Sequence, residues 1–273
     1  MDCARLARVG QDGLLIALPG GAVQLADLRD DEGNSVDPVF LTPRVGSAMT
    51  ALHTGRTVLA IVAHPDDEVL GLGGTLIRHF KAGDEVHVRI VCSGDPIRYA
   101  LGEQDQAADS ERAAYYLGST TRGLRFPDQR LDSGTNLGLI QAVEAEVQAL
   151  KPHTVYTHFW GDVNADHVRI AEAVDVAVRP YNAPSVHQVL AFETPSSTEW
   201  TLAARSGGFH PNVYVDIHQE LDRKIDSMRA YASELRPYPH PRSLRSLREH
   251  AGARGSECGF QAAEDFALLR ELR

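Results

Sequence analysis

Residues 57–73, TVLAIVAHPDDEVLGLG, decide the fold of this chain. The first six residues are an almost unbroken apolar run, as expected of a strand buried on both faces of a sheet. A histidine, a proline and three consecutive carboxylates follow at once. Burying such groups is costly without a cation or a partner, and open α/β sheets bind ligands at the carboxyl ends of their strands. The stretch therefore predicts a parallel sheet with a ligand site at this strand end.

Two side chains of this acidic turn are suited to hold one metal ion. His64 offers an imidazole nitrogen and Asp67 offers a carboxylate oxygen. Asp66 lies between them and stays free to act as a base on metal-bound water. Glu68, the next residue, suits the first turn of a following helix, where the helix dipole favours a carboxylate.

A second polar cluster follows another predicted strand about a hundred residues later. Residues 153–159, HTVYTHF, form the predicted strand and lead into WGDVNADH. His167 at the end of that cluster is the expected third ligand, and Asp166 beside it can accept a hydrogen bond and orient an imidazole. Two histidines, one carboxylate and an open position are typical of hydrolytic zinc sites, whereas structural sites are closed and rich in cysteine. His158, on the strand itself, points either to the site or to the core, and we favour the core.

Strand and helix patterns alternate from residue 57 onward. Apolar runs predict further strands near residues 86–92, 124–126, 186–193 and 212–217. Helical spacing predicts helices near residues 71–83, 107–117, 136–150, 167–178, 219–235 and 262–272. Repeated strand-helix units with short loops predict a mostly parallel α/β sheet with helices on both faces.

The beginning of the chain differs from the rest. Apolar segments on either side of Pro19, Gly20 and Gly21 predict two short strands around a turn, and a polar, linker-like stretch follows. We expect residues 1–55 to be a small β-rich extension and residues 56–273 to be the main domain.

Composition excludes several classes of protein. The 273 residues carry a formal net charge of −10, which argues against a general nucleic-acid binder. The amino-terminal stretch lacks the apolar core of a signal peptide, and no apolar run is long enough to span a membrane. The three cysteines, Cys3, Cys92 and Cys258, lie far apart and fit a reducing compartment, although one disulfide stays open. We therefore expect a cytoplasmic protein without a nucleic-acid or membrane partner, and leave open whether it forms a homo-oligomer.

The sequence resembles the PIG-L/LmbE-like family of zinc-dependent amide hydrolases. The resemblance is carried by AHPDDEVLGLGGTL at residues 63–76 and by DVNADH at residues 162–167. It extends over residues 57–273 and includes FPDQRLD, ETPSSTEW and YASELRPYPHPRS. The family includes deacetylases of N-acetylglucosamine conjugates and of sugar-containing natural products, and amidases of thiol conjugates.

The resemblance has direct implications for fold and site. It implies a Rossmann-like fold, in agreement with the alternation of strands and helices. It also implies zinc on His64, Asp67 and His167, with Asp66 as the general base.

One position departs from the family pattern. Many members have a histidine three residues before the last ligand, whereas this chain has Asn164. An amide NH2 group can donate to an oxyanion but cannot transfer a proton at neutral pH. The general acid is then either Asp66, after it has taken the proton of water, or another group. Our candidate is His240, which a proline-flanked segment can project over the site.

Four side chains are candidates for binding the substrate, and each has a simpler alternative. Asp95 and Arg98 follow the second strand, where either a substrate-contacting loop or an exposed turn is expected. Asp128 either binds sugar hydroxyls or pairs with Arg130. Trp160, next to the second polar cluster, either stacks on a sugar face or packs against the protein.

These features together predict a zinc-dependent N-deacetylase, although another divalent metal is also open. Its small-molecule substrate would be an N-acetylated amino sugar or a sugar-containing conjugate, and its products acetate and a free amine. The sugar in this expectation comes from the family resemblance alone. Two alternatives stay open: an amidase that cleaves a larger acyl or thiol-conjugate amide, and a non-catalytic metal- or sugar-binding protein.

Overall fold

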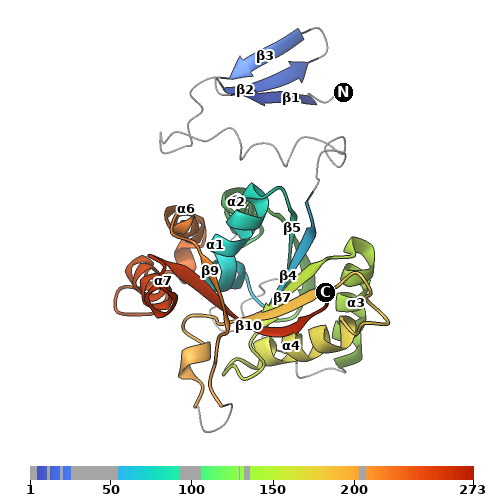
Figure 1. Ribbon diagram of the computed structural model, residues 1–273, viewed down its shortest axis with the longest axis vertical. Coiled ribbons are helices and arrows are strands. Elements are labelled where there is room, and N and C mark those ends of the chain that lie inside the picture. Colours follow the sequence, from blue (N-terminus) through green and yellow to red (C-terminus); the bar gives the residue numbers. More distant parts are fainter. Residues whose placement is uncertain are drawn as a thin grey trace. The chain divides into compact units, whose positions relative to one another are not determined.

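A seven-stranded mixed sheet organises the larger part of the computed structural model (Figure 1), in the order β6-β5-β4-β7-β8-β10-β9. Its strands are β4 (Thr57–Val62), β5 (Glu85–Cys92), β6 (Thr120–Phe126), β7 (Thr154–His158), β8 (Gln188–Phe192), β9 (Val213–Asp216) and β10 (Ala263–Glu271). The strands from β6 to β8 are parallel, and β10 runs antiparallel to both β8 and β9. The expected mostly parallel α/β fold is confirmed.

The chain divides into two compact units, Met1–Thr54 and Gly55–Arg273. The structure describes residues 5–10, 13–18, 21–25, 55–92, 106–128, 130–131, 136–202 and 207–273. In the first unit, β1 (Arg5–Gly10), β2 (Gly13–Leu18) and β3 (Gly21–Leu25) form an antiparallel sheet, one strand more than expected. The candidate substrate contacts Asp95 and Arg98 lie outside the described residues. Within the described ranges, no helix combines the length and apolar character needed to cross a bilayer.

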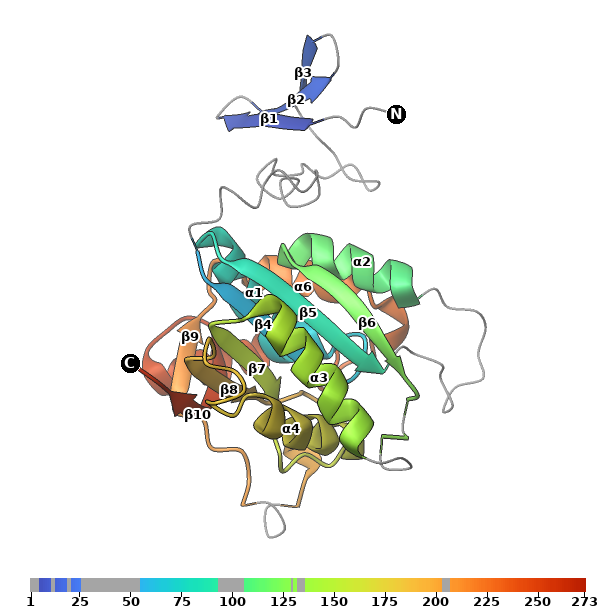
Figure 2. The ribbon, with the colours of Figure 1, turned by 90° about the vertical axis from the view of Figure 1, so that its right-hand side faces the viewer.

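Helices cover both faces of the seven-stranded sheet (Figure 2). One face carries α1 (Asp67–Lys81), α2 (Gln106–Leu117), α6 (Leu221–Arg229) and α7 (Leu244–Cys258), and the other carries α3 (Asn136–Leu150) and α4 (Ala165–Ala177). Two further segments are short 3-10 helices, η3 (Thr198–Trp200) and η4 (Ala232–Glu234). Each face has its own apolar core, as a two-faced sheet requires.

Strand β4 is an unbroken apolar run because each of its two faces packs against a core. Val58, Ala60 and Val62 belong to the core on the α1 face, whereas Leu59 and Ile61 belong to the core on the α3 and α4 face. Because side chains alternate along a strand, a strand with a core on each face has no position left for a polar residue.

The carboxyl-terminal expectation was wrong. Residues 262–272 were expected to form a helix, but residues 263–271 form the strand β10. The segment is rich in good helix formers, yet pairing with β8 and β9 on its two sides overrides that local preference. Helix α7 was not predicted, and the single helix predicted near residues 219–235 is shorter, because α6 ends at Arg229.

Helix α1 has a break that a buried ion pair stabilises. Leu72 has the non-helical angles φ −146° and ψ 16°. Lys224 Nζ donates to the carbonyl of Leu70 at 3.0 Å and to Glu264 Oε1 at 2.7 Å. Glu264 accepts from the backbone amide of Gly74 at 2.8 Å and, through its other oxygen, from the next amide at 2.7 Å. The pair thus satisfies backbone groups on both sides of the break, and so fixes the helix whose first turn carries the acidic motif.

Candidate metal centre

The three predicted ligands come together at the carboxyl ends of β4 and β7. His64 lies between β4 and α1, Asp67 is the first residue of α1, and His167 lies in the first turn of α4. One ligand atom from each lies within 4.8 Å of the other two. Asp67 Oδ2 is 3.4 Å from His64 Nδ1 and 3.4 Å from His167 Nε2. Ligand atoms bound about 2.1 Å from a tetrahedral zinc ion lie about 3.4 Å apart, so these two spacings fit zinc.

His167, the expected third ligand, is buried among carboxylates. The residue is 2% exposed, and both of its ring nitrogens are buried without a hydrogen-bond partner among the described residues, although each lies near a carboxylate oxygen, Nε2 at 3.4 Å from Asp67 Oδ2. Leaving such an atom unpaired is costly, which favours a cation at this position. Burial lowers the pKa of His167, but Asp67 and Asp162 more than offset this and raise it to about 9. The site therefore attracts positive charge, as a metal centre must.

The other nitrogen of His167 faces a carboxylate that the sequence analysis did not single out. Asp162 Oδ2 lies 3.3 Å from His167 Nδ1. Asp162 in turn accepts hydrogen bonds from the hydroxyls of Ser197 and Thr198. An acidic residue five positions before His167, in the same polar cluster, was the available signal.

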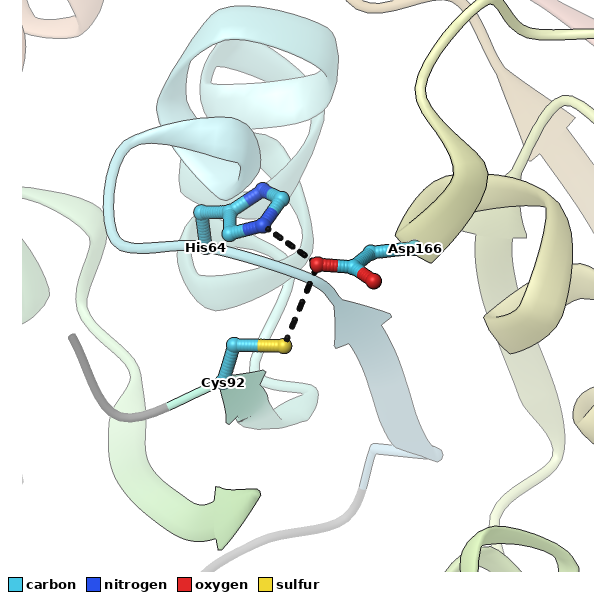
Figure 3. A group of neighbouring side chains, drawn as sticks. All are labelled: His64, Cys92 and Asp166. Atoms are coloured by element: carbon cyan, nitrogen blue, oxygen red, sulfur yellow. Dashed lines mark hydrogen bonds and ion pairs between the residues drawn. The ribbon is translucent and has the colours of Figure 1, made fainter. Parts of the chain in front are cut away.

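Asp166 is placed against His64 instead. Its Oδ2 atom lies 3.2 Å from His64 Nε2, and Asp128 Oδ1 lies 3.1 Å from the same nitrogen. Figure 3 shows Asp166 between His64 and Cys92, whose Sγ atom is 3.8 Å from Asp166 Oδ2. Carboxylates on Nε2 direct the opposite nitrogen, Nδ1, toward Asp67, in the usual manner of a metal-ligating histidine.

His158 lies directly beneath the predicted ligands. It is fully buried, its Nε2 atom accepts a hydrogen bond from the Ala63 amide at 2.9 Å, and its ring stacks on His167 at a centroid distance of 3.9 Å. Burial, with a further contribution from His167, lowers the pKa of His158 to about 4. His158 is therefore a neutral, hydrogen-bonded core histidine, as favoured from the sequence, and it also contacts His167.

Asp66 is held in an unusual conformation. Its φ of 110° is in the left-handed region, which few non-glycine residues adopt and which is concentrated at functional sites. Glu68 Oε2 accepts from the Asp66 amide at 3.2 Å, and Glu68 Oε1 accepts from the Tyr231 hydroxyl at 2.6 Å. Burial and the neighbouring Asp67 raise the pKa of Asp66, while Arg242 opposes the shift. A carboxyl with a raised pKa is suited to taking up and returning a proton.

Asn164 and His240 have different surroundings. Asn164 Oδ1 accepts from the Asp166 amide at 3.0 Å and so caps the start of α4, which leaves its NH2 group to donate elsewhere. The ring of His240 packs edge-on against Trp200 at 5.7 Å, and its Nδ1 atom accepts from the Arg242 amide at 3.1 Å. In this proline-flanked segment, Arg242 is the residue that contacts Asp66.

Both tryptophans of the chain are about half exposed. Trp160, which follows β7 by two residues, is 48% exposed, and Trp200 at the end of η3 is 53% exposed. The turn that carries Trp200 is tied to the second polar cluster through Thr198 and Asp162.

A further acidic cluster is already neutralised. Ligand atoms of Glu193, His250 and Asp265 lie close enough together for one cation. Arg254 Nε, however, lies 2.9 Å from both Glu193 Oε1 and Asp265 Oδ2. The guanidinium already supplies the positive charge, so this cluster is an ion-pair network.

Comparisons with known proteins give a matching family and several similar proteins. Residues 59–178 match the model of the PIG-L family, described as GlcNAc-PI de-N-acetylase. The chain is 29% identical over 178 residues to the uncharacterized deacetylase YaiS of Escherichia coli K12, covering 63% of this chain and 88% of YaiS. It is 32% identical over 130 residues to the 1D-myo-inositol 2-acetamido-2-deoxy-alpha-D-glucopyranoside deacetylase of Kineococcus radiotolerans, covering 46% of this chain and 32% of that enzyme.

The fold alone does not determine the reaction. The crystal structure of GalB, the 4-carboxy-2-hydroxymuconate hydratase of Pseudomonas putida KT2440, is similar with a TM-score of 0.63 and 17% identity, covering 80% of this chain and 98% of GalB. Because a hydratase shares this architecture, the reaction has to be argued from the site.

Proposed function

We propose that this chain, which contains a PIG-L family domain, is a metal-dependent N-deacetylase that removes the acetyl group from an N-acetylated amino sugar or sugar conjugate. The observation that carries the proposal is the convergence of His64, Asp67 and His167 beside the Asp66 carboxylate. Hydrolysis of an amide is supported by the comparisons, because the matched family is described as a de-N-acetylase and both relatives are named deacetylases. The amino sugar in the proposal comes from the family description and from the Kineococcus enzyme.

His64, Asp67 and His167 would hold the metal ion. Two nitrogens and one carboxylate oxygen suit zinc, and the unpaired Nε2 atom of His167 supports a cation at this position. A divalent ion bound there supplies Lewis acidity for the amide carbonyl and lowers the pKa of water to near neutrality.

The remaining groups would move the proton and stabilise the developing negative charge. Asp66 takes the proton of the attacking water and returns it to the amide nitrogen as the C–N bond breaks. The Asn164 NH2 group donates to the oxygen that develops negative charge. His240 is the second candidate for the general acid, but burial and Arg242 lower its pKa, which disfavours its protonated form. Asp66 is therefore our first assignment for both roles.

Substrate contacts are assigned from exposure and position. The exposed Trp160 ring offers a face on which a sugar can stack. Asp128 has one oxygen on His64 and a second oxygen for a sugar hydroxyl. Asp95 and Arg98, which lie outside the described residues, stay candidates from the sequence alone.

The test combines metal analysis with a screen for acetate release. The zinc-loaded protein is offered N-acetylglucosamine, N,N′-diacetylchitobiose, N-acetylated aminocyclitols, a nucleotide-linked N-acetylglucosamine, and amides with larger acyl groups or thiol conjugates. We expect one bound zinc ion per chain and acetate release from at least one compound, with Asp66→Asn keeping the zinc but losing the activity. Release of larger acids from bulky amides without acetate would favour the amidase alternative. A zinc-loaded protein inert toward every amide would favour a binding protein.

A further inference from the structure

We propose that Arg242 is the positioning residue of the Asp66 carboxylate and that Glu234 holds Arg242 in place. The inference rests on the proposed function, because it assigns Asp66 the role of proton carrier. Arg242 is not one of the predicted ligands and follows Asp66 by 176 residues, so only the fold brings the two together.

The contact is direct and partly shielded from water. Arg242 Nη1 donates to Asp66 Oδ2 at 3.2 Å and to Glu234 Oε2 at 2.9 Å. Asp66 is 3% exposed, and the side chain of Arg242 is about three-quarters buried. An ion pair shielded in this way is stronger than one at the surface and restricts both partners to one geometry.

Asp66 needs such a partner because its backbone does not settle the position of its carboxylate. The left-handed φ of Asp66 is stabilised by Glu68, which accepts from the Asp66 amide, and by helix α1, whose first amides donate to the Asp66 carbonyl. These bonds fix the main chain only. Arg242 binds Oδ2 and thereby leaves Oδ1 as the oxygen that receives the proton.

Arg242 is itself set by the structure around it. The next residue, Ser243, caps α7 through its hydroxyl, which accepts from the Ser246 amide at 3.0 Å. The Arg242 amide donates to His240 Nδ1, and Glu234 binds the guanidinium from η4. The main chain at Arg242 is thus fixed by the bond to His240 and by the start of α7, and Glu234 holds the guanidinium beside Asp66, as a second layer of a catalytic site requires.

Kinetics of Arg242 variants test the assignment, with acetate release from the best compound of the screen as the readout. We expect Arg242→Ala to lower kcat about 30- to 100-fold with KM within about threefold, because proton transfer depends on orientation and substrate binding does not. Arg242→Lys should recover part of the loss, and guanidinium ion at about 50 mM, far below denaturing concentrations, should partly rescue Arg242→Ala. Arg229→Ala, which removes an ion-paired arginine from the surface of α6, is the matched control and should keep full activity.

The energetic coupling between Arg242 and Asp66 is measured by repeating Arg242→Ala in the Asp66→Asn background. If Arg242 acts through Asp66, Arg242→Ala should add little to the residual loss in Asp66→Asn. An unchanged kcat, a loss confined to KM, or multiplicative losses in the double variant would each overturn the positioning role.

The inference and the proposed function fail in different ways. If the wild type releases no acetate from any compound, the proposed function fails. The contact between Arg242 and Asp66 is then tested separately. Urea unfolding of the metal-free protein is measured for the single and double variants at positions 66 and 242. Non-additive shifts of the urea midpoint would support the contact, and additive shifts would overturn it.

Discussion

Asp162 Oδ2 lies 3.3 Å from Nδ1 of His167, on the opposite side of the imidazole from Nε2, which faces Asp67. This arrangement fixes which nitrogen of His167 is free for a metal ion. The hydroxyls of Ser197 and Thr198 hold Asp162 in turn, so the segment after β8 supports His167, the proposed ligand on α4.

Asp162→Asn should therefore weaken zinc binding about 10- to 100-fold, as is usual when the carboxylate behind a ligating histidine is lost. Competition with a chromophoric chelator measures the affinity. Asp226→Asn, on the exposed face of α6, is the control and should bind zinc like the wild type. An Asp162→Asn protein with unchanged zinc affinity would remove Asp162 from the account.

Asn164 permits a separation of its two functions. Asn164→Ala should lose the helix cap, at a cost of about 1 kcal/mol in unfolding free energy, and should also lose the oxyanion donor. Asn164→Asp keeps a capping oxygen but has no NH2 group, so it should retain stability while kcat falls about 100-fold. Thermal unfolding and acetate release distinguish the two effects. An active Asn164→Asp variant would exclude the oxyanion role.

His240→Ala decides between the two candidates for the general acid. Because the His240 ring packs on Trp200 and its pKa is lowered, we expect a change of no more than about threefold in kcat across the pH range. A loss of about 100-fold or more, greatest where the wild type is fastest, would instead assign the acid to His240.

The buried Lys224–Glu264 pair should be important for stability. Glu264→Ala leaves the Lys224 charge and two α1 amides without a partner, which should cost about 3–5 kcal/mol of unfolding free energy. Urea unfolding measures this loss. The exposed pair of Arg245 and Glu249 is the control, and Arg245→Ala should change stability by less than about 1 kcal/mol. Equal losses of unfolding free energy in Glu264→Ala and Arg245→Ala would contradict the stabilising role given to the Lys224–Glu264 pair.

The Glu193–Asp265 pair predicts a pH dependence of stability away from the metal centre. Burial and Glu193 raise the pKa of Asp265 to about 8, whereas the pKa of Glu193 is lowered to about 2 because His250 and Arg254 outweigh its burial. The folded pair therefore retains a proton that the unfolded chain loses near pH 4, so folded-state stability should decrease as the pH rises from about 4 to 8. Asp265→Asn should remove this contribution. Urea unfolding of the metal-free protein at several pH values measures it, and an identical pH profile for the variant would contradict the assignment.

The sequence predicted the parts of the fold that depend on local pattern. The run before His64 indicated a strand with a core on each face, and the alternation after it indicated the parallel sheet. Strand β10 escaped prediction because its buried carboxylates, Glu264 and Asp265, find partners on α6 and α7, which the local sequence does not reveal. In such a segment, tertiary pairing outweighs helix propensity.

The site was predictable to a similar extent. The convergence of the two polar clusters was predictable because each cluster follows an apolar strand, and the carboxyl ends of parallel strands share one edge of the sheet. The partners of the residues in these clusters were not found. The contacts of Arg242 with Asp66 and of Asp128 with His64 join segments with no common pattern, so distance along the chain hides them.

The central claim is that His64, Asp67 and His167 share one metal ion. Anomalous diffraction at the zinc edge from crystals of the zinc-loaded protein tests this directly. We predict a single peak within about 2.0–2.3 Å of His64 Nδ1, an Asp67 oxygen and His167 Nε2. A peak on the opposite side of the His64 ring, between Nε2, Cys92 and Asp166, would contradict the claim, as would zinc binding that survives His167→Ala unchanged.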